Sequence, residues 1–137
     1  TQWDEVDYLL VDMPPGTGDI ALTVMQNFPI NSLVIVSTPQ DMVSMIVKKV
    51  VAMAEKLAVP VKGVVENMSY ILCDDCGKKH RVFSKKSAEE HAAYLGLPLL
   101  AELPINIDLA EALEEGRTES YAAANPSYTE LATQVLR

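Results

Sequence analysis

The sequence predicts an α/β fold, a parallel sheet flanked by helices. Short apolar runs rich in valine, leucine and isoleucine alternate along the chain with longer amphipathic stretches. Strands that alternate with helices of this length form βαβ units, and such units build a parallel sheet. The chain has 137 residues, of which 49% are hydrophobic and 22% charged, so one globular domain of ordinary composition accounts for it.

Four short runs are expected as strands, because each is rich in branched apolar residues and is closed by a turn or polar residue. They cover residues 7–13, 32–38, 61–67 and 98–103. A polar excursion over residues 69–84 interrupts the alternation and contains CDDCGKKH. A long excursion from a compact α/β core is more often functional than decorative, so we expect a functional loop there.

The stretch 41–58 has the pattern of an amphipathic helix. Asp41 is a suitable N-cap residue, and Ser44, Lys48 and Glu55 share a polar face. Methionine, valine and isoleucine fill the rest of the helix surface. We expect these apolar side chains to pack in the core.

Capping residues mark the other helices. One helix is expected to open at Asp19, and glycines are expected to end two others, at Gly96 and Gly116. Three further starts carry the spacing of a capping box, namely Ser87 with Glu90, Asp108 with Glu111, and Ser127 with Glu130. After the first of these starts, one helical face collects Ala88, His91, Ala92 and Leu95.

Charge and cysteine usage exclude several classes of function. The formal net charge of -8 argues against a general nucleic-acid-binding surface. No apolar run approaches the roughly 20 residues that cross a bilayer, so we expect neither nucleic-acid nor membrane partners. The two cysteines lie together rather than spread as in a secreted disulfide scaffold, which indicates a reducing, cytoplasmic location.

The stretch LLVDMPPGTGDIALT, residues 9–23, places a carboxylate at the end of an apolar run. In P-loop nucleotide hydrolases such an acid ends a hydrophobic strand and holds Mg²⁺, while a glycine backbone approaches the γ-phosphate. Asp12 fits the first role, Gly16 fits the second, and Thr17 adds a hydroxyl group. The alternative is a purely structural strand-to-helix turn, which explains the prolines and glycines but not the acid.

Cys73 and Cys76 are candidate metal ligands, because thiolates three residues apart on a turn can face one metal atom. A tetrahedral zinc or a [4Fe–4S] cluster needs four ligands, and a two-fold dimer would supply them economically. A redox dithiol is the main alternative, although Asp74 and Asp75 are expected to disfavour the thiolate. His80 is a candidate third ligand, and an incidental pair is the remaining interpretation.

Several motifs follow one another in a specific order: VDMPPGTGD from residue 11, STPQ from residue 37, VENMSY from residue 65, then CxxCG, and ELPINIDLAEALEEG from residue 102. Together they resemble the Mrp/ApbC group of MinD-like P-loop ATPases, which act as iron–sulfur cluster carriers or scaffolds. The resemblance implies a MinD-like P-loop NTPase domain, of which residues 1–137 would be the C-terminal portion, with a CxxC loop at about 69–84.

The resemblance also implies roles in nucleotide binding. Asp12 is similar to the acid that organises Mg²⁺, and the phosphate-sensing switch would consist of Pro15, Gly16 and Thr17. Asn67 matches the residue whose amide reads the adenine edge, and Pro104 resembles a residue that lines the base pocket. Both also have ordinary structural explanations, because asparagine and proline often end strands.

The phosphate-binding loop of the group, a glycine-rich stretch with GK[ST], does not occur in these residues. We expect it upstream, on a strand between the 7–13 and 32–38 strands. Without it, the 137-residue chain alone is expected to bind ATP negligibly and to be inactive as an ATPase. The gap in the sheet should close by direct strand pairing, by self-association, or by loose packing of residues 1–27. The group's glycine-rich stretch after the cysteines is also missing.

The expected function of the full-length protein is ATP-dependent carriage of an iron–sulfur cluster and its transfer to apo-proteins. ATP, Mg²⁺ and a cluster, expected as [4Fe–4S], would be its cofactors, and a homodimer would form through the CxxC loop. A MinD/ParA-like regulatory ATPase and a zinc-stapled, non-catalytic dimerisation module are the alternatives. Metal analysis would distinguish these three hypotheses. Iron with labile sulfide would support the cluster carrier, stoichiometric zinc the dimerisation module, and the absence of metal the regulatory ATPase.

Overall fold

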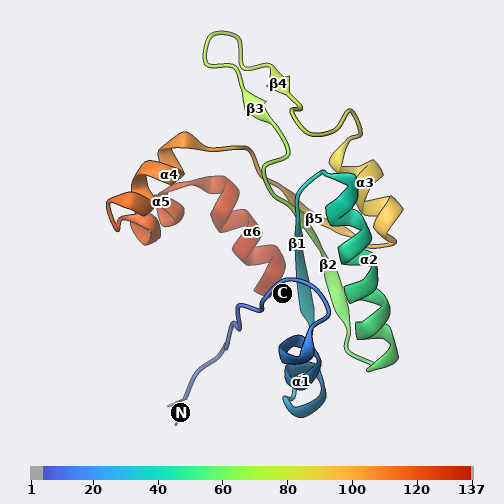
Figure 1. Ribbon diagram of the computed structural model, residues 1–137. Helices are drawn as coiled ribbons and strands as arrows, with labels where there is room; N and C mark the ends of the chain where they lie inside the picture. Colours follow the sequence, from blue (N-terminus) through green and yellow to red (C-terminus); the bar gives the residue numbers. More distant parts are fainter. Residues whose placement is uncertain (1–4, 137) are drawn as a thin grey trace.

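The computed structural model describes residues 5–136 of the chain (Figure 1). Its main sheet has three parallel strands in the order β1-β2-β5, namely β1 (Leu33–Ser37), β2 (Val61–Glu66) and β5 (Leu99–Glu102). The parallel α/β prediction is therefore confirmed, and the strands fall within three of the four expected runs. The helices are α1 (Asp19–Asn27), α2 (Asp41–Lys56), α3 (Ala88–Leu95), α4 (Ile107–Glu114), α5 (Thr118–Ala124) and α6 (Pro126–Leu136).

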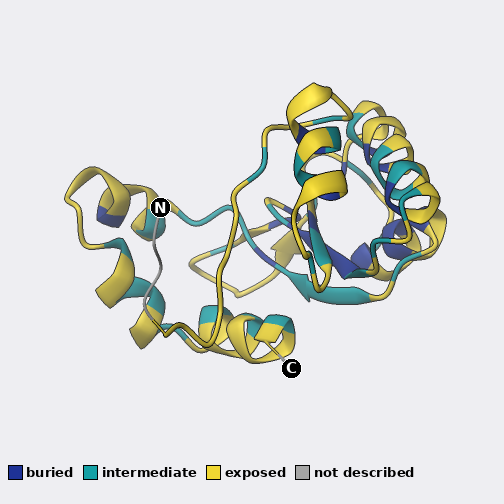
Figure 2. Cartoon of the chain, turned by 90° about the horizontal axis from the view of Figure 1, so that it is seen from below, coloured by how far each residue is buried: buried dark blue, intermediate teal, exposed yellow. Residues whose placement is uncertain are grey.

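One face of the sheet is covered by α2 and α3 (Figure 1). Ile35 of β1 and Val64 of β2 form the centre of this core. Val47 from α2 and Ala92 and Leu95 from α3 pack against them, and Figure 2 shows the buried residues concentrated between these helices and the sheet. Each large aliphatic side chain buried in this way contributes about 2 kcal/mol. This packing holds the carboxyl ends of the strands in place.

The strand expected over residues 7–13 is wrong, because this segment pairs with no strand in the described structure. Tyr8–Val11 is exposed, and Leu10 retains 78% of its accessible surface. An apolar run forms a strand only where a sheet edge accepts its backbone hydrogen bonds. Of the three outcomes expected for the gap, loose packing describes this segment, whereas α1 itself buries Ala21 and Met25.

The polar face expected for α2 is only partly correct. Ser44 is buried in the core, whereas Met42 and Met45 are exposed rather than packed. Ser44 can enter the core because its Oγ lies 2.6 Å from Nε2 of His91 on α3. A buried hydroxyl is tolerated when such a partner offsets the loss of water.

The helix boundaries confirm some caps and correct others. Ser87 and Glu90 form the expected capping box of α3, and Gly96 ends that helix in the left-handed region at φ +71°. Gly116 likewise follows the end of α4 at φ +70°. Three expected N-caps are wrong, because Gln40, Asn106 and Asn125 stand at these starts instead of Asp41, Asp108 and Ser127. Asn106 and Asn125 accept hydrogen bonds from backbone N–H groups two or three residues on, and Pro126 then suits the first helical position.

The opposite face of the sheet is covered only in part. α6 lies against β5, and Lys62 at the start of β2 donates from Nζ to the carbonyl oxygen of Val135 at 2.7 Å. Val36 on β1 remains 64% exposed on this side. Among residues 5–136, no helix combines the length and the hydropathy needed to span a bilayer.

The functional loop expected at 69–84 contains a short antiparallel hairpin of β3 (Ile71–Leu72) and β4 (Lys79–His80). The hairpin projects from the carboxyl end of the main sheet, and its turn carries both cysteines (Figure 1). The excursion is thus an ordered arm, with its base at the strand ends.

Candidate functional site

The three parallel strands end at one common edge. Glu66 is paired in register with Ser37 of β1 and with Glu102 of β5. Backbone hydrogen bonds continue past the strand ends, because the amide of Asn67 donates to the carbonyl of Ser37 at 2.7 Å. Beyond it, the amide of Ser69 donates to the carbonyl of Leu103 at 2.9 Å. Hydrogen bonds therefore hold the strand ends together at the carboxyl edge. Ligands bind at this edge in open α/β sheets.

Asn67 and Pro104 are brought together at this edge. Asn67 directly follows β2, and Pro104 lies between Leu103 and Ile105, both of which are bonded to the segment after β2. Both residues are half-buried. The Oδ1 atom of Asn67 accepts a hydrogen bond from the amide of Met68 at 2.9 Å, which fixes the side-chain amide at the strand end.

The segment that contains Asp12, Pro15, Gly16 and Thr17 does not join that edge. It runs past the C-terminus and the amino ends of the strands, at the opposite end of the sheet from the hairpin (Figure 1). Asp12, Pro15 and Thr17 are exposed, and Gly16 has a φ of +86°, a conformation that favours glycine. The turn therefore forms locally, but the strand that would carry Asp12 to the carboxyl edge has no pairing partner.

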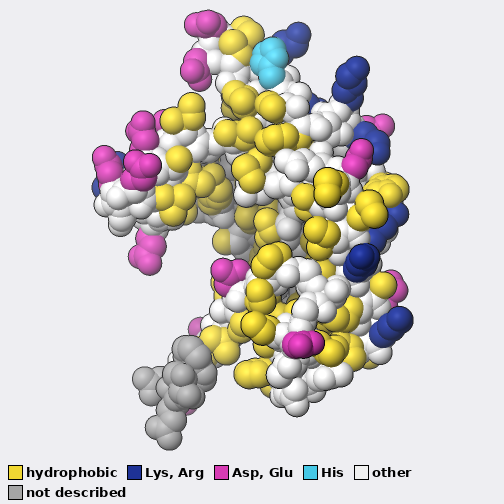
Figure 3. Space-filling view, viewed as in Figure 1, with side chains coloured by type: hydrophobic (Ala, Val, Ile, Leu, Met, Phe, Trp, Pro, Cys, Tyr) yellow, Lys and Arg dark blue, Asp and Glu magenta, His cyan; other side chains and the backbone are white. Residues whose placement is uncertain are grey.

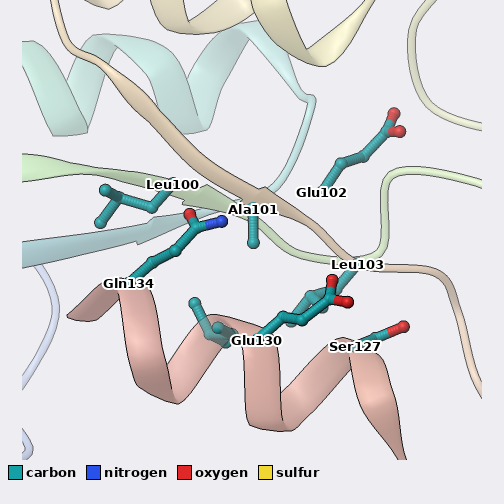
Figure 4. Close-up of a pocket in the computed structure, with 8 residues that line it drawn as sticks. Leu100, Ala101, Glu102, Leu103, Ser127, Glu130 and Gln134 are labelled. Carbon is teal, nitrogen blue, oxygen red and sulfur yellow. The ribbon is translucent and has the colours of Figure 1, made fainter. Parts of the chain in front are cut away.

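A shallow pocket of about 160 Å³ lies between β5 and α6 (Figure 4). Gln134 reaches from α6 toward Leu100 and Ala101 on β5, whereas the carboxylate of Glu130 lies beside Leu103. Sites for drug-sized ligands usually enclose at least about 300 Å³. Since this pocket is smaller and includes none of the predicted site residues, it is not a candidate nucleotide site.

Cys73 and Cys76 occupy the turn of the hairpin. The amide of Cys73 donates to the carbonyl of Lys78 at 3.0 Å, and the amide of Gly77 donates to the carbonyl of Cys73 at 2.8 Å. Gly77 adopts a φ of +66°, which lets the chain reverse immediately after Cys76. Both thiols are free, with Cys73 half-buried and Cys76 exposed. The turn thus presents two soft sulfur ligands, a donor set that suits zinc or an iron–sulfur cluster.

The pKa of the Cys73 thiol is lowered below its ordinary value. The largest cause is a hydrogen bond from the backbone N–H of Cys76, followed by one from the backbone N–H of Asp75. The charge of Asp74 acts in the opposite direction and is weaker. The charge of Asp74 therefore disfavours the thiolate of Cys73, as expected, but the amides of the turn stabilise the anion more strongly.

His80 does not join the two cysteines. It lies in β4, where it is paired across the hairpin with Ile71. Within residues 5–136, no group of three or more His, Cys, Asp or Glu side chains is arranged to hold a metal ion. The hairpin of one chain therefore offers two sulfur ligands.

The structure contains a buried polar network that sequence reasoning missed. Nδ1 of His91 lies 2.5 Å from Oε2 of Glu66, and Nε2 lies 2.6 Å from Oγ of Ser44. These contacts have the arrangement of a Ser-His-Glu triad. Ser44 and His91 are only 3% and 6% exposed, however, so no substrate reaches them and the contacts are structural. The buried face of the helix after Ser87 indicated His91, but no local pattern indicated its partners.

The network continues to the base of the cysteine hairpin. Glu102 accepts from Lys79 at 2.8 Å and from Arg81 at 2.7 Å. Burial acts to raise the pKa of Glu102, but hydrogen bonds from Lys79 and Ser69 outweigh it and lower the pKa overall. The same bond with Glu102 raises the pKa of Lys79. Both shifts favour the charged pair and so strengthen the attachment of β4 to β5.

The parallel sheet, with polar residues at the carboxyl ends of adjacent strands, places the chain in the class of open α/β proteins, in which ligands bind outside the carboxyl ends of the strands. The chain belongs to the family described as ParA: NUBPL iron-transfer P-loop NTPase, whose model matches residues 1–137. This membership confirms the MinD-like P-loop assignment that the ordered motifs predicted.

Three curated proteins illustrate the relationship. An iron-sulfur cluster carrier protein of Clostridium perfringens is 73% identical over 129 residues, covering 94% of this chain and 45% of that protein. An iron-sulfur cluster carrier protein of Escherichia coli K12 is 42% identical, covering 98% and 37%. The iron-sulfur cluster transfer protein NUBPL of Mus musculus is 40% identical, covering 98% and 44%. The chain spans less than half the length of these relatives.

A solved structure agrees with the fold. It is the nucleotide-binding protein in complex with ADP from Archaeoglobus fulgidus, with Co found by PIXE. It superimposes with a TM-score of 0.78 at 43% sequence identity, covering 93% of this chain and 51% of that one.

Proposed function

We propose that the full-length protein is an ATP-dependent iron–sulfur cluster carrier that holds its cluster through Cys73 and Cys76 and transfers it to apo-proteins. The observation that carries the proposal is the turn of the hairpin, where two free thiols lie together and backbone amides favour the thiolate of Cys73. The names of the curated relatives, iron-sulfur cluster carrier and transfer proteins, support the same assignment.

The number of ligands supports a shared cluster. A [4Fe–4S] cluster is held by four cysteine thiolates, whereas one hairpin supplies two. Two copies related by a two-fold axis would supply four, because an isologous contact places the same residues on both sides. We therefore propose a homodimer in which the hairpins of two protomers meet at the cluster.

The surface around the hairpin suits such a contact. Figure 3 shows hydrophobic side chains gathered at the base of the hairpin, below its charged tip. Four exposed apolar residues, which we term the hairpin patch, are Ile71, Leu72, Val82 and Phe83. An apolar surface next to ligands that need a partner is typical of a protein interface.

The nucleotide would bind at the carboxyl edge of the sheet. Asn67 and Pro104 are proposed to contact the base, since both lie at the ends of adjacent strands on one edge. Asp12 is proposed to anchor Mg²⁺, with Pro15, Gly16 and Thr17 sensing the terminal phosphate. These roles require residues 8–18 to move to the same edge, which the pairing of residues 7–13 in a more complete sheet would achieve.

Metal analysis tests the proposal against its alternatives. After anaerobic reconstitution with iron and sulfide, the full-length protein is expected to contain iron and labile sulfide in equal amounts, about two of each per chain, as a bridging [4Fe–4S] cluster requires. Stoichiometric zinc in the purified protein, with no capacity for iron, would instead identify a dimerisation module. Absence of any bound metal would favour a regulatory ATPase.

The hairpin patch gives a second prediction. Phe83→Asp in the full-length protein is expected to weaken dimerisation of the cluster-loaded form by about tenfold or more, because a buried phenylalanine contributes about 1.5–3 kcal/mol. Sedimentation at several protein concentrations measures the change. Ile107→Asp is the matched control, since Ile107 is exposed in the first turn of α4, where a carboxylate is tolerated. An unchanged dimer in Phe83→Asp would place the interface elsewhere.

A further inference from the structure

Arg81 directly follows β4 and connects the hairpin to the strand ends of the main sheet. Its Nη2 atom lies 2.7 Å from Oε1 of Glu102, and its Nη1 atom lies 3.0 Å from Oγ of Ser69. Nη1 is also 3.9 Å from Oε1 of Glu66, whose side chain is only 1% exposed. One guanidinium therefore reaches the ends of both β2 and β5. The planar fork of arginine can make such contacts simultaneously, whereas a lysine ammonium is a single point charge.

Ser69 makes the need for this cation clear. Its Oγ lies 2.6 Å from Oε1 of Glu66 and 2.8 Å from Oε1 of Glu102. A hydroxyl has one proton to donate, so it can donate to only one of the two carboxylates at a time. Two acidic side chains thus converge on one serine in a largely buried place. Without nearby cations their repulsion would drive them apart. Lys79 pairs with Glu102 alone, whereas Arg81 lies beside both carboxylates.

The two ends of the network are fixed independently. At the inner end, Glu66 is held by His91, which in turn contacts Ser44 of α2. At the outer end, Lys79 of β4 binds Glu102, and its Nζ lies 4.0 Å from the ring centroid of Tyr70. Arg81 lies between these ends. Unlike Lys79, it reaches Glu66 as well as Glu102, and so it links the buried end of the network to the hairpin.

We propose that Arg81 is the positioning residue of the cysteine pair: by bridging Glu66, Ser69 and Glu102 it fixes the hairpin against the sheet edge, so that Cys73 and Cys76 are held ready for metal. The proposal rests on the proposed function, in which those thiols are ligands. Groups that orient metal ligands typically change metal affinity by about 10–100-fold when removed, and Arg81 would act in this way through the orientation of the hairpin, since its contacts are with Glu66, Ser69 and Glu102 rather than with a thiol.

The test uses the full-length protein without cluster, with Co²⁺ alone as the probe of the two thiols. Arg81→Met is expected to weaken Co²⁺ binding by about tenfold or more in a chelator competition, and Arg81→Lys should restore part of the loss because it keeps the charge. Lys85→Met is the matched control, since Lys85 is an exposed cation of the same loop that makes no ion pair among the described residues.

Hydrogen exchange separates positioning from general stability. In Arg81→Met, the amides of Cys73 and Gly77 should exchange faster, while the amide of Val64, bonded to Pro98 in the core, should keep its rate. Wild-type Co²⁺ affinity in Arg81→Met would overturn the proposal, as would an equal rise in exchange at the hairpin and in the core. If Arg81→Met does not fold, the same measurements are made on Arg81→Lys, because its positive charge still offsets the repulsion between Glu66 and Glu102.

Failure of the proposed function would look different from failure of this inference. A wild-type protein that takes up no iron on reconstitution contradicts the carrier function. An Arg81→Met protein whose hairpin amides exchange at the wild-type rate contradicts the positioning role, whatever the metal content.

Discussion

Replacing Cys73 or Cys76 by serine in the full-length protein is expected to remove at least about nine-tenths of the iron that the wild type takes up, together with its broad brown absorbance. Serine is nearly the same size as cysteine, but its hydroxyl does not ionise at neutral pH and is a poor ligand for iron. Because each hairpin offers only two sulfur atoms, the loss of one leaves a bridging cluster with two of its four ligands.

The measurement is iron and labile sulfide per chain after anaerobic reconstitution, supported by the absorption spectrum. Asp75→Asn is the matched control, since it changes an exposed side chain between the cysteines and leaves both thiols in place. This control should take up iron as the wild type does. Full iron content in either serine variant would show that the pair does not bridge a cluster.

Asp12→Asn in the full-length protein is expected to slow ATP hydrolysis by about 100-fold while the fold is retained. The carboxylate is proposed to anchor Mg²⁺, and a metal ion contributes several kcal/mol to stabilisation of the transition state, with each 1.36 kcal/mol equal to a factor of ten in rate. Asparagine has the same shape but lacks the charge that holds the ion.

Steady-state phosphate release, with circular dichroism as a check on folding, measures this effect. Asp19→Asn is the control, because Asp19 is an exposed acid in the first turn of α1, seven residues further along the same segment. It should hydrolyse ATP at close to the wild-type rate. Turnover in Asp12→Asn equal to the wild type would make the acid a structural residue of the turn.

Local patterns were sufficient for most elements of the fold. The three paired strands follow from short branched apolar runs, and α3 follows from the Ser87 capping box and from Gly96. These features depend on residues that are close together in sequence, so they can be predicted without the tertiary structure. The ordered motifs likewise predicted the family, which the match over residues 1–137 confirms.

Two of the errors arose where a residue's environment comes from distant parts of the chain. Residues 7–13 have the composition of a strand, but a strand forms only by pairing its backbone hydrogen bonds, and this segment pairs with neither β1 nor β5, the outer strands of the described sheet. Ser44 has the character of a surface residue, but it lies in the core. There His91, 47 residues away in sequence, replaces the hydrogen bond to water that the hydroxyl loses on burial. The pKa of Cys73 has a local cause instead, because the backbone amides of Cys76 and Asp75 lower it by more than the charge of Asp74 raises it.

The sequence by itself determined the parallel α/β class, the family, and the pair of cysteines as the chemically distinctive feature of the chain. Only the tertiary structure decided that these cysteines stand on a hairpin, and that Asn67 and Pro104 follow the ends of adjacent strands at its base. It alone revealed that Arg81 ties the hairpin to Glu66 and Glu102. The physical reason is that hydrogen bonds and ion pairs depend on distances of a few ångströms between residues far apart in sequence, and folding rather than spacing sets those distances.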